Sequence, residues 1–499
     1  MTKPIDEYDI EAEGMLVRVA ISHEPGAAPL YHIVITQFKP ATIALLNDIK
    51  QQLITELRLT STEVLDAKMI DSIKEKFKQK AFALFSDRLP KAKSGELNLL
   101  VTYLTHEMLG LGKIEFLLQD SQLEEIIVNS AREPIRVYHK KHGWLETNIF
   151  VKDEAQIQNY SSIIARRVGR QITTLHPLLD AHLVSGDRAN AVLYPIATKG
   201  NTITIRKFVR DPWTVTDFIQ NKTGDSTLFS LIWIAMQYEM NILISGGTGS
   251  GKTSLLNVIM PFIPFNHRII SIEDTRELQL PEYLYWAPLV TRQPNPEGKG
   301  EVTMLDLLIN ALRMRPDRII LGEIRKGRDA EVLFEAMHTG HSVYATLHAD
   351  SIGETIQRLI HPPINVPPNL LSAVNLNVVM FRDRRKGIRR IYQVGEFITE
   401  TESATPQPGI LYRWKPESDA MVEHNKPTRF FDNLARHTGM TYAEIAKDLK
   451  IKEKILNYMV KHNLRDVQSV GKIMRKYYLD EKAVVSHVLA AKSPKQLLE

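Results

Sequence analysis

Residues 246–253 have the types and spacing of a phosphate-binding loop. They read Gly-Gly-Thr-Gly-Ser-Gly-Lys-Thr, which matches the pattern G-x-x-x-x-G-K-[ST]. The apolar run at residues 241–245 before them is typical of a buried strand, and the segment after them has helical character. A strand, a glycine-rich loop and a helix N-terminus together surround an anion with backbone N–H groups. The pattern therefore predicts a nucleotide-binding loop.

The residues of this loop have different expected roles. Lys252 is expected to reach the β- and γ-phosphates, and the Thr253 hydroxyl is expected to bind Mg²⁺. ATP and Mg²⁺ are therefore the expected cofactors. The other nucleotide-binding candidates of this segment are Gly246, Gly247, Thr248, Gly249, Ser250, Gly251 and Ser254.

Acidic residues follow two later apolar strands. The first strand ends in Glu273, Asp274 and Glu277, and the second ends in Glu323. The carboxyl ends of strands are where open α/β sheets bind ligands. Nucleotide hydrolysis requires Mg²⁺ ligation and a group that positions water, so either Glu273 or Glu323 is expected to orient the water. Glu323, through water, and Glu277 are further Mg²⁺ candidates, and Asp274 is a secondary candidate.

Two histidines enclose the next expected strand. His341 and His348 lie seven positions apart, which places them at the two ends of a strand. We expect His341 to sense the γ-phosphate and keep His348 as a secondary candidate. A zinc site is not expected, because neither cysteines nor a compact His-x-x-x-His pattern supports one.

The composition is that of a folded protein of several domains. The chain has 499 residues, of which 43% are apolar, and 63 basic and 58 acidic residues leave a net charge of +5. This charge predicts no general attraction to nucleic acid or membranes. The N-terminus does not resemble a signal peptide, and the apolar run at residues 228–236 is too short to span a bilayer. We expect a cytoplasmic protein that reaches the membrane through a partner.

Periodicity and composition divide the chain into five parts. Strands alternate with helices around the phosphate-binding loop, which predicts a parallel α/β sheet with covered faces. The expected parts are a mainly helical region after a short β-like start at 1–110, an α+β domain at 111–210, a hinge at 211–227, the nucleotide-binding α/β domain at 228–400, and a linker with a helical tail at 401–499.

Two segments allow more than one interpretation. The basic run at residues 382–390 lies between expected strands, and we favour a solvated hairpin tip over a docking site for an acidic partner surface. The tail at 441–464 begins with a capping box and resembles a helix-turn-helix with a break before about residue 453. Its second helix has few basic residues, so we favour a packing or docking module over DNA binding.

Taken in order, four segments resemble the motifs of one ATPase family. They are similar to the Walker A, Asp box, Walker B and His box of the type II/type IV secretion and pilus-assembly ATPases. The matching segments are 246–253, 272–277, 318–323 and 340–348, and similar sequences upstream are 143–148, 177–180, 186–188 and 205–208. Residues 312–325 are most similar to the archaeal branch, which includes archaellum and pilus motors. Two departures are the lack of cysteines for the zinc module of many bacterial members and Asp187 where the family often has Ser.

The resemblance implies an ATPase that forms a homo-hexameric ring. It implies a RecA-like motor domain and a mobile N-terminal domain whose arginines reach the phosphates. Arg188 is the best match and Arg206 the next, with Arg325 and Arg313 as alternatives from the motor domain. Such a ring would act on a polytopic membrane platform protein to power filament assembly, rotation or export.

Two other functions compete with this expectation. A DNA-translocating or conjugation-type RecA-like ATPase would share the phosphate-binding loop, but the Asp and His boxes argue against it. A non-catalytic nucleotide-binding scaffold is disfavoured because Lys252, Thr253, Glu273 and Glu323 are all present. Nucleic acid is therefore not an expected partner.

Overall fold

The structure, a computed structural model, divides into two compact units. The units are Met1–Arg210 and Asp211–Glu499. It describes residues 4–12, 15–23, 26, 28–34, 38–57, 70–183, 185–208, 212–294, 298–398 and 405–498. None of the helices in these ranges combines the length and the apolar character that crossing a bilayer requires.

The N-terminal unit is built on one sheet with the strand order β1-β2-β3-β6-β5-β4-β9-β8-β7. Neighbouring strands are antiparallel, except β3 and β6, which are parallel. The strands are β1 (Asp6–Ala12), β2 (Met15–Ser22), β3 (Leu30–Val34), β4 (Leu123–Val128), β5 (Arg136–His139), β6 (Gly143–Thr147), β7 (Leu178–His182), β8 (Arg188–Val192) and β9 (Thr202–Arg206). Alternate residues of β3 and β8 are buried, as in a sheet with one covered face.

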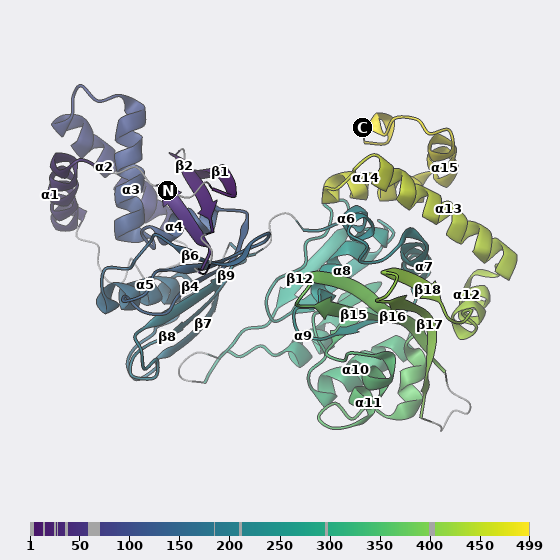
Figure 1. The fold of residues 1–499 in the computed structure, drawn as a ribbon. Coiled ribbons are helices and arrows are strands. Elements are labelled where there is room, and N and C mark those ends of the chain that lie inside the picture. The colour runs from purple at the N-terminus through teal and green to yellow at the C-terminus, as the bar shows by residue number, and fades with distance from the viewer. Residues whose placement is uncertain are drawn as a thin grey trace. The chain divides into compact units, whose positions relative to one another are not determined.

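Helices of this unit form two groups. The helices α1 (Pro40–Leu57), α2 (Ile70–Arg88) and α3 (Ser94–Leu109) pack into a core of their own (Figure 1). The helices α4 (Ile114–Gln119) and α5 (Glu154–Arg167) pack on the sheet. One sheet extends across the expected boundary after residue 110, because β1, β2 and β3 pair into the same sheet as β4–β9. The parallel pairing of β3 with β6 joins segments more than a hundred residues apart, which local patterns do not reveal.

The C-terminal unit contains a second sheet with the order β12-β11-β13-β14-β10-β15-β16-β17-β18. From β12 to β15 the strands are parallel, and from β15 to β18 they are antiparallel. Its strands are β10 (Ile242–Gly246), β11 (Arg268–Glu273), β12 (Tyr285–Val290), β13 (Arg318–Leu321), β14 (Ser342–Leu347), β15 (Leu376–Asp383), β16 (Ile388–Ile398), β17 (Gln407–Lys415) and β18 (Ala420–Glu423). Helices lie between the parallel strands, except between β11 and β12, so the predicted α/β class with an α+β N-terminal region is confirmed.

The helices of this unit cover both faces of the sheet, as two separate apolar cores show. Short 3-10 helices lie at Met260–Phe262, Leu312–Met314 and Pro368–Ala373. The helices are α6 (Val215–Gln220), α7 (Ser226–Gln237), α8 (Lys252–Ile259), α9 (Met304–Ala311), α10 (Gly327–His338), α11 (Ile352–Ile360), α12 (Arg429–Thr438), α13 (Tyr442–Lys461), α14 (Val467–Leu479), α15 (Glu481–Leu489) and α16 (Lys495–Leu498).

The segment that was expected as a linker before the C-terminal helices contains regular strands. Strands β17 and β18 lie in it, and β17 pairs along β16. Leu411 and Trp414 of β17 are buried, so this polar segment still contributes to the packed unit. Pro408 stands opposite Phe397 near the start of β17, where a strand tolerates proline best.

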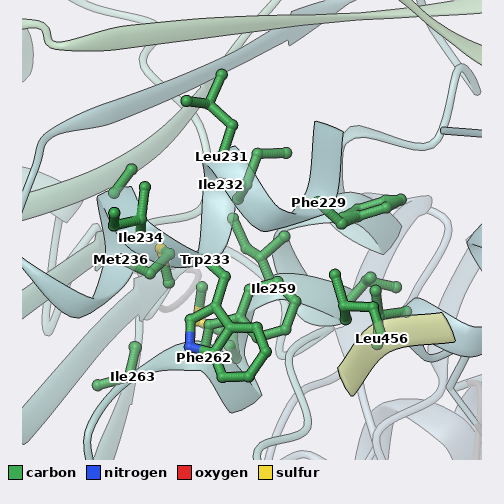
Figure 2. Packing of buried hydrophobic residues seen from close by; sticks show 14 of the residues in the cluster. Phe229, Leu231, Ile232, Trp233, Ile234, Met236, Ile259, Phe262, Ile263 and Leu456 are labelled. Carbon is green, nitrogen blue, oxygen red and sulfur yellow. The ribbon is translucent and has the colours of Figure 1, made fainter. Parts of the chain in front are cut away.

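The helical tail predicted at the C-terminus is confirmed, but the predicted break is not present. Thr441 and Glu444 form the expected capping box, and α13 then continues without interruption for 20 residues. This helix packs on α7, which is buried on all sides (Figures 1 and 2). Trp233 of α7 stacks on Phe262 with ring centroids 5.4 Å apart, and Leu456 of α13 belongs to the same core. The tail is therefore part of the fold of the C-terminal unit.

Candidate active site

The phosphate-binding loop connects β10 to α8. Gly249 has φ +71° and Gly251 has φ +99°, a left-handed backbone that favours glycine. The first helical residue after these turns is Lys252, so the N-terminus of α8 opens toward the loop. The Ser250 Oγ atom is buried and has no hydrogen-bond partner among the described residues. The loop thus offers a helix N-terminus and a hydroxyl without a partner in the described residues, and both are hydrogen-bond donors that can bind a phosphate.

The Lys252 ammonium lies within this loop. Its Nζ donates to the Gly246 and Gly247 carbonyl oxygens at 2.9 and 3.0 Å and lies 3.2 Å from Nδ1 of His348. Burial lowers the pKa of Lys252, and the nearby Glu323 and Asp350 carboxylates oppose this change. A phosphate that entered the loop could replace the carbonyl oxygens as the partner of this ammonium.

Neighbouring parallel strands bring acidic and imidazole groups to the same edge of the sheet. Glu273 is the last residue of β11, Glu323 follows β13, and His348 follows β14 directly. His348 Nε2 lies 2.9 Å from Glu323 Oε1. Burial lowers the pKa of His348, followed by the effect of the Lys252 ammonium, so the ring is neutral near pH 7. The neutral ring then accepts from Lys252 at Nδ1 and donates from Nε2 to Glu323.

The chain of polar contacts continues beyond Glu323. Arg325 donates from Nε to Glu323 Oε2 at 2.8 Å, and its Nη1 pairs with Asp274. Asp274 also accepts from the Thr291 hydroxyl at 3.1 Å. A continuous network therefore joins Lys252 to the edge strand β12, which ends just before Thr291.

Glu273 has the most perturbed carboxyl group of the site. Burial raises its pKa to about 7, although the backbone N–H groups of Glu277 and Leu278 donate to Oε1 at 2.9 and 3.1 Å and oppose this shift. Oε2 is buried and has no partner among the described residues. A carboxyl group that changes its charge near neutral pH and has a free oxygen is suited to general base catalysis.

The donor set fits Mg²⁺ bound together with nucleotide. Thr253 is half-buried at the start of α8, and Glu323 and Asp274 lie near the same edge of the sheet. Glu277 is exposed, but its backbone N–H holds Glu273. Within the described residues, no group of three or more His, Asp or Glu side chains could hold a metal alone. Phosphate oxygens and water would therefore have to complete the shell, as Mg²⁺ prefers.

The expectation for His341 requires a correction. His341 precedes β14, whereas the loop and Lys252 lie at the carboxyl end of the neighbouring β10, which is parallel to β14. The His341 ring lies 3.3 Å from the Ala336 carbonyl oxygen and from the Thr339 hydroxyl. The spacing correctly put the two histidines at opposite ends of a strand, but the strand direction brings His348 to the loop.

The N-terminal unit holds the two candidate arginines side by side. Arg188 of β8 stands directly opposite Arg206 of β9, both at the same end of the sheet and both exposed. Arg188 makes a bidentate pair with Asp180, with distances of 3.0 and 2.7 Å. The fork-to-fork geometry fixes the direction of the guanidinium group. Asp187 does not contact Arg188 in this way; it accepts from the Phe208 N–H and the Ser185 hydroxyl instead.

The sequence-based account missed two groups that contact the phosphate-binding loop. Arg389 donates from Nε to the Gly249 carbonyl oxygen at 3.1 Å, and Nη1 of Arg382 approaches the same glycine. The basic run was recognised, and its residues 384–386 are exposed as expected for a hairpin tip. The missed contacts arise because β15 and then β16 follow β10 in the sheet, which the motif order does not show.

Along much of its length the chain is similar to known proteins. A sequence profile described as "Type II/IV secretion system protein" matches residues 111–384. An uncharacterized protein of Methanocaldococcus jannaschii is 34% identical over 439 residues, which cover 86% of this chain and 77% of that protein. The type IV secretion system protein PtlH of Bordetella pertussis is 30% identical over 306 residues, which cover 55% of this chain and 89% of that protein.

Among solved structures, the VirB11 ATPase from the Brucella suis type IV secretion system is 27% identical, with a TM-score of 0.30. The alignment covers 56% of this chain and 90% of that chain. The pilus retraction motor PilT with bound ADP is 18% identical with a TM-score of 0.41, and the alignment covers 67% and 89%. The profile and the sequence relatives decide the assignment, and all four motifs lie within the residues that the profile matches. The chain belongs to the type II/IV secretion system protein family.

Proposed function

We propose that this chain is a MgATP-dependent ATPase that works as a ring-forming motor of a secretion or filament machine. The observation that carries the proposal is the contact of Lys252 with His348, and of His348 with Glu323, at the carboxyl ends of β10, β14 and β13. Glu273 ends the neighbouring strand β11 at the same edge of the sheet. These groups supply phosphate binding, a γ-phosphate sensor and a base, which hydrolysis of a phosphoanhydride requires together.

The residues divide the work according to their positions. Lys252 and the loop N–H groups hold the β- and γ-phosphates, and Ser254 and Thr253 extend this contact along α8. Bound Mg²⁺ would neutralise phosphate charge, with Thr253 as its protein ligand and Glu323 reaching it through water. Glu273, with its pKa near 7, accepts the proton of the attacking water. We assign the base to Glu273 rather than Glu323 because Glu323 is already held by His348 and Arg325.

His348 is the sensor in this proposal. Its ring joins the lysine that binds the γ-phosphate to the network of Glu323, Arg325 and Asp274. The Lys252 ammonium contacts either its carbonyl partners or a bound phosphate. Which of these it contacts determines whether the His348 imidazole keeps its hydrogen bond with Lys252. The network therefore gives the γ-phosphate a route to β12 through Thr291.

We base the proposed machine and its partners on the family of the chain. A homo-hexamer with Arg188 and Arg206 reaching the phosphates of a nucleotide is the arrangement we propose, because both arginines lie on one exposed row of the N-terminal sheet. The partner would be a polytopic membrane platform protein, and the chain would act at the cytoplasmic face of the membrane. The match to a Methanocaldococcus protein favours the archaeal branch, with an archaellum or pilus-like filament as the driven structure.

Steady-state ATP hydrolysis by the purified chain tests the proposal. We expect turnover that falls at least about a hundredfold in Lys252→Ala, because the phosphate-binding lysine stabilises charge that develops in the transition state. Anionic vesicles and DNA are added in separate arms. Turnover that depends on Lys252 and ignores DNA supports the secretion motor. Strong stimulation by DNA would favour a translocase, and no turnover in any arm would contradict the ATPase proposal.

A further inference from the structure

The β15–β16 hairpin lies on the side of the phosphate-binding loop away from the hydrolytic groups. In the sheet, β14, β13 and β11 lie on one side of β10, and β15 and β16 lie on the other. Glu273, Glu323 and His348 all come from the first side. A nucleotide held by the loop with its γ-phosphate toward those groups would therefore turn its diphosphate and nucleoside portion toward the hairpin.

Two arginines of the hairpin contact the loop itself. Arg389 donates from Nε to the Gly249 carbonyl oxygen at 3.1 Å. A Cβ atom added at Gly249 would lie only 2.6 Å from Nη1 of Arg382, and one added at Gly251 would lie 3.5 Å from Cδ of Arg389. The two side chains therefore lie directly against the loop at residues 249 and 251.

The charge of this pair is not balanced. Arg382 and Arg389 stand directly opposite each other in the β15–β16 register, where like charges are unfavourable. Within the described part of the chain, neither makes an ion pair, in contrast to the neighbouring Arg390, which pairs with Asp419 at 2.7 Å. Asp383 uses its carboxylate for the backbone N–H groups of the hairpin turn. Two unpaired guanidinium groups against a phosphate-binding loop form a binding site for an anion.

We propose that Arg382 and Arg389 bind the diphosphate portion that ADP and ATP share, and thereby set nucleotide affinity separately from hydrolysis. The inference rests on the proposed function, in which the loop holds a nucleotide. Both arginines approach from the side opposite to the base and the sensor, so their contacts are made equally with substrate and product. They therefore control how tightly ADP is retained after hydrolysis.

Equilibrium binding of a fluorescent ADP analogue to the full chain, with unlabelled ADP and ATP as competitors, tests this inference. We expect Kd to rise about tenfold for both nucleotides in Arg382→Gln and in Arg389→Gln, the effect of losing one hydrogen bond to a charged group. Kd of the wild type should also rise steeply with salt, and less steeply in each variant, because the lost contact is electrostatic. A purely structural role for the arginines would not change this salt dependence.

Two residues of the same hairpin supply matched controls. Arg384 and Arg385 are exposed at the tip, and their replacement by Gln removes the same charge. We expect Arg384→Gln and Arg385→Gln to bind ADP within about twofold of the wild type, because a distant solvated charge contributes little. The inference would be overturned if the tip variants weakened ADP binding as much as Arg382→Gln and Arg389→Gln do. It would also be overturned if Arg382→Gln and Arg389→Gln bound ADP as tightly as the wild type.

The design separates this inference from the proposed function. A wild-type chain that binds ADP but does not hydrolyse ATP would contradict the proposed function and leave the binding comparison intact. If a Gln variant does not fold, Arg389→Lys and Arg382→Lys keep the charge but lose the planar fork. These variants should still weaken ADP binding, and affinity equal to that of the wild type would refute the assignment.

Discussion

At the scale of single residues, Glu273 is the group whose chemistry the structure defines most sharply. Its carboxyl is buried, its pKa is raised to about 7, and one oxygen has no partner among the described residues. A general base must be ionised to accept a proton, so activity should be lost as the pH falls through the pKa of the base. The burial that raises this pKa thus sets a pH limit on turnover.

We predict that kcat of the wild type decreases on the acidic side with an apparent pKa near 7. Glu273→Gln should lower kcat by about 10²–10⁴-fold, the usual contribution of a positioned base, and should remove this acidic limb. The measurement is kcat against pH for both proteins at saturating MgATP. An unchanged acidic limb in Glu273→Gln would assign the titration to another group.

The two histidines provide a second prediction at this scale. His348 lies between Lys252 and Glu323, whereas His341 contacts only local groups at the other end of β14. His348→Ala should lower kcat by about a hundredfold or more, by analogy with the loss of one preorganised donor in an active site. His341→Ala removes the same type of side chain and should change kcat by less than about threefold, since surface substitutions rarely matter. The opposite order of effects would restore His341 as the sensor.

At the scale of secondary structure elements, the strands determine which side chains can meet. The phosphate-binding loop, both acidic motifs and the strand enclosed by the histidines were predictable from sequence, because each is a local pattern of glycines, apolar runs and charges. The choice between His341 and His348 was not, since it depends on the direction of β14 beside β10. The contacts of Arg382 and Arg389 depend on β15 pairing with β10 across more than a hundred residues, which local patterns also do not show.

The strands β7 and β8 support a prediction about the arginines of the N-terminal unit. Asp180 of β7 holds Arg188 of β8 through two hydrogen bonds, so it acts as a positioning residue. Asp180→Asn should lower kcat by about tenfold, and Arg188→Gln by about 10³-fold, as for an arginine that contacts the transferring phosphate. Neither change should lower the melting temperature noticeably, because exposed ion pairs contribute little to stability.

The same sheet contains a matched control for this prediction. Arg136 and Glu146 form a comparably exposed pair on neighbouring strands β5 and β6, 2.7 Å apart. Glu146→Gln should leave kcat within about twofold of the wild type, as most surface substitutions do. Equal effects of Glu146→Gln and Asp180→Asn on kcat would show that Asp180 acts through the general stability of the sheet.

At the scale of the whole molecule, the helices α12–α16 belong to the C-terminal unit, which also contains the phosphate-binding loop. Trp233 of α7 donates from Nε1 to the Tyr478 hydroxyl of α14 at 2.9 Å. The Lys452 ammonium of α13 lies 5.3 Å from the centre of the Trp233 ring. Lys452 is fully buried and donates to the Tyr477 hydroxyl at 3.1 Å. A buried charge with these partners fixes how the helices dock on α7. The sequence predicted helices here, but their docking depends on contacts between distant segments.

In the proposed function, the chain hydrolyses ATP as an assembled ring. The most direct measurement is turnover per chain as a function of protein concentration, with the mass of the particles determined by light scattering in the same samples. We expect turnover per chain to rise together with assembly, because part of each site would come from a neighbouring copy, and Lys252→Ala to stay inactive at every concentration. Turnover that remains constant while the chain is monomeric, or that persists in Lys252→Ala, would contradict the account.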